Sequence, residues 1–192
     1  MPLTIGLTGG IAAGKSSSLA VFERLGAATI SSDAVVHELL NSEPLLGRLI
    51  ERWGGEVAPG GRVDRSKIGE VVFADPEELA WLEAQIHPLV GGRIKEWLDS
   101  LAPDTEIAVV EVPLLFEGEM APVFDTTVAV VTAEELRRSR AEARGHTLVG
   151  EREARQLSQE EKAARAEHVV ENDGTLDELE QRLSALVAKL SG

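Results

Sequence analysis

The sequence predicts an α/β fold: a doubly wound, parallel, five-stranded sheet with a helical insertion. Short apolar runs recur along the chain, and they are almost continuously apolar, as in parallel strands that are covered on both faces. Longer amphipathic segments with helix start signals lie between these runs, which is the alternation typical of α/β proteins. The stretch between the second and third runs is too long for one crossover and therefore indicates an insertion.

The strand predictions rest on five apolar runs. Each is short enough for a strand and lies between longer amphipathic segments. The runs are 3–8, 28–30, 107–112, 127–131 and 168–172.

Helix starts are predicted by capping residues. Asp75 followed by Pro76 gives an N-cap and a proline at the first helical position. Two further starts have a threonine three residues before a glutamate, the capping-box pattern: Thr132 with Glu135, and Thr175 with Glu178. The last helix carries one apolar stripe, formed by Leu176, Leu179, Leu183, Leu186, Val187 and Leu190.

These elements predict a core that is interrupted twice. The segment after the second strand has only helical patterns, with a loop over 54–65, and a polar segment rich in arginine and glutamate looks like a helical flap. The expected divisions are core 1–33, helical insertion 34–104, core 105–135, flap 136–166, and core with C-terminal helix 167–192.

Composition excludes several classes of function. The 192 residues carry a net charge of −14 and include no cysteine, which excludes disulfides, thiolate metal sites and cysteine nucleophiles. Nucleic acids and anionic membranes both require a basic face, so neither is expected as a partner. The apolar N-terminus has no basic residue before Lys15 and is interrupted by glycines, unlike a secretory leader. With no run of 18 apolar residues, a cytoplasmic location is expected.

The residues after the first predicted strand form a phosphate-binding pattern. Gly9 and Gly14-Lys15-Ser16 complete G-x-x-x-x-G-K-[ST], in which backbone N–H groups and a helix N-terminus surround an anion. The lysine reaches the β- and γ-phosphates of a nucleotide, and the serine hydroxyl ligates Mg²⁺. The alternative is a glycine-rich turn that matches by accident. No N-K-x-D segment is present, which disfavours a GTPase switch.

Asp33 lies just after the second predicted strand. In a doubly wound sheet the ligand crevice is at the carboxyl ends of the strands, so this carboxylate is expected to face the transferring phosphate. There it would accept the proton of a hydroxyl acceptor. The alternative is that Asp33 only caps the helix that follows.

Together with the phosphate-binding pattern and Asp33, four further sequence motifs make the chain resemble the dephospho-coenzyme A kinases. The resemblance runs from about residue 3 to 190 and includes "VDR" (63–65), "FADPEELAWLEAQIHPLV" (73–90), "VPLLFE" (112–117) and "VVENDG" (169–174). It implies a P-loop kinase-type fold with a core, a helical acceptor-binding domain and a helical lid. It also implies transfer of the ATP γ-phosphate to the ribose 3′-hydroxyl of dephospho-coenzyme A, in the presence of Mg²⁺.

The resemblance assigns roles to residues of this chain. The catalytic residues would be Asp33, Lys15 and Arg140. ATP would be bound by Gly9, Gly10, Ile11, Ala12, Ala13, Gly14, Lys15, Ser16, Ser17, Arg144 and Asn172, with Mg²⁺ on Ser16. The acceptor would be bound by Asp33, Arg65, His87, Pro88, Pro113, Leu114, Leu115 and Glu117. Glu111, at the end of the third strand, would help to hold Mg²⁺ through water.

The sequence departs from the family pattern in a few places. Ala12, Ala13 and Ser17 replace a glycine, a serine and a threonine of the usual loop, but Lys15 and Ser16 are retained. Ser31 replaces the first acid of the usual D-A-D.

Several alternatives remain open at the level of sequence. The arginines within 137–165 could form a solvated helix face, and His87 could lie in a plain turn. Trp53, Trp81 and Trp97 could pack the core of the insertion, or Trp53 or Trp81 could contact the acceptor. The phosphate loop is also compatible with another small acceptor or with a regulatory switch. A monomer or a weak homo-oligomer is expected.

Overall fold

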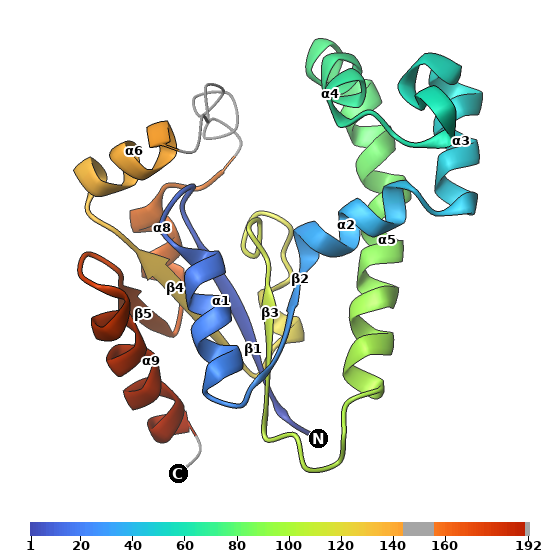
Figure 1. The fold of residues 1–192 in the computed structure, drawn as a ribbon. Coiled ribbons are helices and arrows are strands. Elements are labelled where there is room, and N and C mark those ends of the chain that lie inside the picture. Colours follow the sequence, from blue (N-terminus) through green and yellow to red (C-terminus); the bar gives the residue numbers. More distant parts are fainter. Residues whose placement is uncertain (144–155, 191–192) are drawn as a thin grey trace. The chain divides into compact units, whose positions relative to one another are not determined.

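The computed structural model describes residues 1–143 and 156–190, and Figure 1 shows its fold. The chain divides into two compact units. The first combines Met1–Ser31 with the residues from Leu101 onward, and the second is Ser32–Ser100.

The first unit contains a five-stranded sheet in the order β2-β3-β1-β4-β5, in which every pair is parallel. The predicted α/β class and all five predicted strands are confirmed. The strands are β1 (Leu3–Gly9), β2 (Ala28–Ser31), β3 (Ile107–Glu111), β4 (Thr126–Val131) and β5 (His168–Glu171).

The strand order separates β1 from β2. In register, Leu7 of β1 lies beside Glu111 of β3, and Glu111 lies beside Ser31 of β2. The carboxyl ends of β1 and β2 therefore lie at the same end of the parallel strands. They are two strand spacings apart, roughly 10 Å.

Both faces of the sheet are covered. Helices α1 (Lys15–Arg24) and α9 (Leu176–Leu190) pack on one face, around buried side chains that include Ile5, Leu7, Phe22, Val109, Val130, Leu179 and Leu183. On the opposite face, a Cβ on Gly6 would lie 2.7 Å from Phe124, so glycine admits the ring there. Helix α8 (Gln159–Arg165) contacts β1 and β4, and a 3₁₀ turn, η3 (Ala121–Val123), precedes β4.

The start of α9 confirms one predicted capping box. The backbone N–H of Thr175 donates to Glu178, and the N–H of Glu178 donates to the hydroxyl of Thr175 at 3.3 Å. The predicted stripe is wrong at one position, since Leu176 is 54% exposed. Leu176 is the first residue of the helix, before the turn that packs on the sheet.

The other predicted capping box is wrong. Helix α6 runs over Glu134–Ala143, and the hydroxyl of Thr132 donates to the carbonyl of Ala13 at 2.8 Å instead of capping it. The N–H of Ala133 donates to the carboxylate of Asp173. The hydroxyl of Thr132 thus contacts the loop between β1 and α1, not the N-terminus of α6.

The second unit is helical throughout. Its elements are α2 (Ser32–Leu40), α3 (Glu43–Trp53), η1 (Gly55–Val57), η2 (Pro59–Gly61), α4 (Arg65–Ala74) and α5 (Pro76–Asp99), and α5 packs against both α2 and α4. The predicted N-cap is confirmed, because the Asp75 carboxylate accepts from the N–H of Glu77 and Pro76 opens α5. The segment predicted as a loop contains the two short 3₁₀ turns.

Two tryptophans join α3 to α5. The rings of Trp53 and Trp81 meet edge to face at 5.3 Å, and the Arg52 guanidinium lies 4.6 Å from the ring centre of Trp81. Glu78 accepts from Arg52 and from the Trp53 indole N–H. These contacts support the structural role for Trp53 and Trp81. In the described part of the chain, no helix is both long and apolar enough to cross a membrane.

Candidate active site

The loop between β1 and α1 has the shape of the predicted phosphate cradle. Gly9 ends β1, and Gly14 is the N-cap residue of α1. A Cβ on Gly9 would lie 2.5 Å from the carbonyl oxygen of Val130. Gly14 has a φ of 100°, and a Cβ there would lie 2.0 Å from Nδ2 of Asn172. Both glycines of the motif are therefore required by the geometry of the loop.

The first turn of α1 provides an electropositive surface. It contains no acidic side chain. The N–H groups of a first helical turn lack intrahelical acceptors, and the helix dipole adds positive potential at this end. Ser16, the second residue of α1, is exposed, and its hydroxyl is the type of oxygen ligand that Mg²⁺ accepts. The turn is thus suited to an anion and to a magnesium ion beside it.

Lys15 lies over the loop that precedes it. Its Nζ donates to the carbonyl of Gly9 at 3.0 Å and to the carbonyl of Gly10 at 2.9 Å. These two carbonyls place the ammonium at the loop, and charged phosphate oxygens would offer it stronger, charge-assisted hydrogen bonds.

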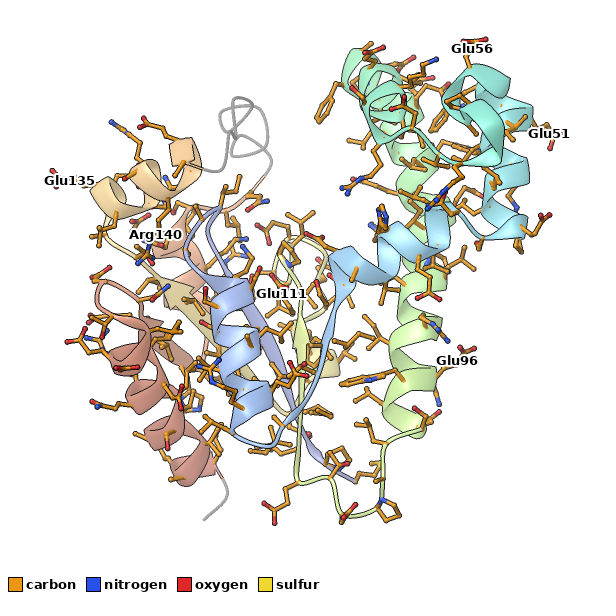
Figure 2. All side chains as sticks on the ribbon, viewed as in Figure 1. Glu51, Glu56, Glu96, Glu111, Glu135 and Arg140 are labelled. Atoms are coloured by element: carbon orange, nitrogen blue, oxygen red, sulfur yellow. The ribbon has the colours of Figure 1, made fainter. Side chains whose placement is uncertain are left out.

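The side chains of Asn172 and Arg140 lie close to the phosphate loop. Asn172 is 7% exposed, and its Nδ2 donates to the carbonyl of Ala13 at 2.8 Å. Arg140 projects from α6 (Figure 2), and its Nη1 donates to the carbonyl of Asn172 at 3.0 Å. Both side chains thus contact the backbone that supports the phosphate loop.

Arg137 is a site residue that the sequence analysis counted only as a member of the arginine cluster. Its side chain is 17% exposed, pairs with Glu134, and reaches the carbonyl of Ile11 at 3.5 Å. It lines a cavity of about 360 Å³ together with Gly10 and residues 156–161. Arg137 and Arg140 are about one helical turn apart, so their side chains lie on the same face of α6. That spacing is the sequence signal that could have indicated that the two arginines act at the same place.

Glu111 brings a carboxylate to the same edge of the sheet. It is the last residue of β3 (labelled in Figure 2) and is 6% exposed. In register it lies beside Leu7 of β1. Its strand neighbours the strand that leads into the phosphate loop.

The Pro113–Glu117 stretch is attached to α8 by a buried lysine. Lys162 is fully buried, and its Nζ donates to the carbonyl of Pro113 at 2.5 Å and lies 3.1 Å from the Glu117 carboxylate. The same carboxylate accepts from the N–H of Leu157 at 2.8 Å. Burial lowers the pKa of the Lys162 ammonium, and the hydrogen bond to Glu117 opposes that shift. Leu115 is fully buried in this stretch, whereas Leu114 is 39% exposed.

Replacing Lys162 is expected to destabilise the fold. Lys162→Met would leave the Glu117 carboxylate buried without its cation, and removing one partner of a buried pair costs about 3–5 kcal/mol. In a chain of this size that corresponds to a fall of roughly 10 °C in the midpoint of thermal unfolding. Circular dichroism melts would measure it.

The matched control for that substitution is Lys189→Met, because Lys189 is exposed in the last turn of α9. It should shift the melting temperature only slightly. The double variant Lys162→Met with Glu117→Gln removes both charges and should recover part of the loss. Equal melting temperatures for Lys162→Met and Lys189→Met would contradict the buried ion pair.

Asp33, Arg65, His87 and Pro88 lie in the helical unit. Asp33 is exposed and is the second residue of α2, so it lies inside the first turn and not at the N-cap position. Arg65 opens α4 and is exposed. His87 and Pro88 are exposed in the middle of α5, so the alternative of a plain turn is wrong. Arg144 lies outside the described residues.

Comparisons with known proteins identify the family of the chain's relatives. The sequence model of the dephospho-CoA kinase family matches residues 3–178. A dephospho-CoA kinase of Streptomyces avermitilis is 40% identical over 193 residues, covering 98% of this chain and 94% of its own length. One of Protochlamydia amoebophila is 36% identical, with coverages of 97% and 95%.

Solved structures agree with these relatives. The crystal structure of TT1252 from Thermus thermophilus is 37% identical and has a TM-score of 0.83, covering 100% of this chain and 99% of its own. The dephospho-CoA kinase of Campylobacter jejuni is 27% identical, with a TM-score of 0.73 and coverages of 100% and 98%. A shikimate kinase of Acinetobacter baumannii, 14% identical over 99% of this chain and 95% of its own, has a TM-score of 0.55 and shares the fold.

Proposed function

The chain belongs to the dephospho-CoA kinase family, and on that premise we propose which of its residues carry out the reaction. The enzyme transfers the γ-phosphate of ATP to the ribose 3′-hydroxyl of dephospho-CoA, giving CoA and ADP. The bond that forms joins the 3′-oxygen to the γ-phosphorus, and the bond that breaks joins that phosphorus to the oxygen it shares with the β-phosphate.

ATP phosphates are bound by the loop Gly9–Ser17 in this proposal. The observation that carries it is the position of the Lys15 ammonium on the carbonyls of Gly9 and Gly10, at the N-terminus of a helix without first-turn acids. Lys15 would exchange these carbonyls for the β- and γ-phosphate oxygens and stabilise the charge that develops on them. Arg140, close to the same loop through Asn172, and Arg144 would add further positive charge.

Asp33 is the proposed general base. It would accept the proton of the 3′-hydroxyl and orient that oxygen toward the γ-phosphorus. Arg65, His87 and Pro88 would hold the acceptor from the helical unit, and the Pro113–Glu117 stretch from the sheet unit. In this scheme the insertion 34–104 binds the acceptor, and 136–166 acts as a lid.

Magnesium fits the residues at the loop. Ser16 would hold it directly, and Glu111 would do so through water, since hydroxyl and carboxylate oxygens are its usual ligands. The bound ion would neutralise charge on the β- and γ-phosphates. We also propose that the enzyme acts as a monomer or a weak homo-oligomer.

The test of this assignment is ADP release with a panel of acceptors. Dephospho-CoA is expected to stimulate ADP release far above the acceptor-free rate, and shikimate, gluconate or CoA itself should not. The product should carry its new phosphate on the 3′-oxygen by phosphorus NMR. The proposed acceptor site would be overturned if an unrelated hydroxyl compound stimulated ADP release equally. It would also be overturned if no acceptor changed the rate of ADP release.

A further inference from the structure

The carbonyl of Ala13, inside the phosphate loop, accepts two side-chain hydrogen bonds. One comes from Oγ1 of Thr132, just after β4, and the other from Nδ2 of Asn172, just after β5, both at 2.8 Å. Thr132 is 2% exposed and Asn172 is 7% exposed. Both lone pairs of this carbonyl are thus occupied by buried donors from the ends of two strands.

The consequence is a fixed orientation for the next peptide N–H. In a planar trans peptide the C=O and N–H bonds point in opposite directions. Two donors that hold the Ala13 oxygen on the protein side therefore direct the N–H of Gly14 to the other side. An anion nest needs its N–H groups converging on the ligand and its carbonyls turned away, because a carbonyl oxygen repels phosphate.

The two donors are themselves held firmly. The side-chain amide of Gln159 pairs with both backbone groups of Thr132, accepting from its N–H at 2.8 Å and donating to its carbonyl at 2.9 Å. Asn172 donates its own N–H to the carbonyl of Val131 at 2.8 Å, and its carbonyl accepts from Arg140. These contacts fix the backbone of both donor residues. The hydroxyl of Thr132 has a second acceptor, the carbonyl of Asn172 at 3.3 Å, but the carbonyl of Ala13 is the nearer one.

We propose that Thr132 and Asn172 are positioning residues for ATP binding, which act by clamping the Ala13 carbonyl and thereby aiming the Gly14 N–H at the nucleotide phosphates. The inference rests on the proposed role of the Gly9–Ser17 loop in binding ATP. It gives Asn172 a task on the loop backbone, different from the direct contact with ATP that the family resemblance implies. Arg140, whose Nη1 also lies 3.4 Å from Oγ1 of Thr132, is linked to the loop through the same pair.

The decisive variant is Thr132→Val, which keeps the size and branching of the side chain and removes the hydroxyl. The dissociation constant of ATP, measured by calorimetry, is expected to rise about fivefold to tenfold, the loss of one buried hydrogen bond. KM for ATP should rise in parallel, and KM for dephospho-CoA should stay near the wild-type value. Thr132→Ser, which retains the donor, should bind ATP almost as the wild type does.

Thr127→Val is the matched control. Thr127 is 6% exposed in β4, the strand that ends just before Thr132, but its hydroxyl accepts from the N–H of Glu167, far from the loop in sequence. It should leave ATP affinity unchanged. Asn172→Asp tests the second donor independently, because it places a carboxylate oxygen against the Ala13 carbonyl, and it should weaken ATP binding tenfold or more.

Two outcomes would overturn the clamp: folded Thr132→Val that binds ATP within twofold of the wild type, or Thr127→Val that weakens binding equally. If Thr132→Val does not fold, the same criteria apply to Asn172→Asp against Thr127→Val. Binding of ATP is measured without an acceptor, so a wild-type enzyme that binds ATP but ignores dephospho-CoA would count against the proposed function alone.

Discussion

Replacing Asp33 by asparagine is expected to lower kcat by about 100-fold or more, the usual scale for the loss of a general base. The amide keeps the size of the side chain but cannot accept the proton of the 3′-hydroxyl. KM for ATP should change little, because the proposed ATP contacts come from the loop after β1. Steady-state kinetics with each substrate varied in turn would separate the two parameters.

Asp99→Asn serves as the control for that substitution. Asp99 is an exposed acid at the end of α5 that pairs with exposed Lys95, and such surface pairs contribute little. The control should keep wild-type turnover. If Asp33→Asn also kept it, Asp33 would be left as an acid in the first turn of α2, with only the favourable interaction that a helix dipole gives any such carboxylate.

The three central strands β1, β3 and β4 were predictable because most of their residues are buried, whichever face of the sheet they point to. A position such as Val109 or Val128 must be apolar whichever way its side chain points, so the run stands out against its amphipathic neighbours. The strand order was not predictable in the same way. That β3 lies between β1 and β2 depends on pairings between distant segments, which no local pattern records.

In the candidate site, too, residues that form a local sequence pattern were predictable, and residues whose role depends on distant contacts were not. Gly9, Gly14 and Lys15 follow one another at a spacing that only phosphate loops require, so they could be recognised directly. Thr132 could not, since a threonine before a helix serves equally as a cap or as a donor to a distant carbonyl. Lys162 lies in a helix rich in glutamate and resembles a surface residue, yet Pro113 and Glu117 surround it.

Lys15→Met is expected to reduce kcat/KM by about 100- to 1000-fold, the scale for removing a group that stabilises transition-state charge. The ammonium is already at the loop, on the carbonyls of Gly9 and Gly10, so little reorganisation is needed for it to reach phosphate oxygens. Methionine fills a similar volume without the charge. The enzyme should therefore remain folded, and its melting temperature should no longer rise when ATP is added.

Two comparisons isolate the role of that charge. Lys15→Arg keeps the charge but spreads it over a planar group that cannot take the position of an ammonium, so it should recover only part of the activity. Lys189→Met, on the exposed last turn of α9, removes the same charge from the net total and should behave as the wild type. If Lys15→Met and Lys189→Met had equal kcat/KM values, catalysis would not depend on a cation in the loop. The N–H groups of the loop and of α1 would then have to stabilise the transferring phosphate alone, and the clamp on Ala13 would become the larger contribution.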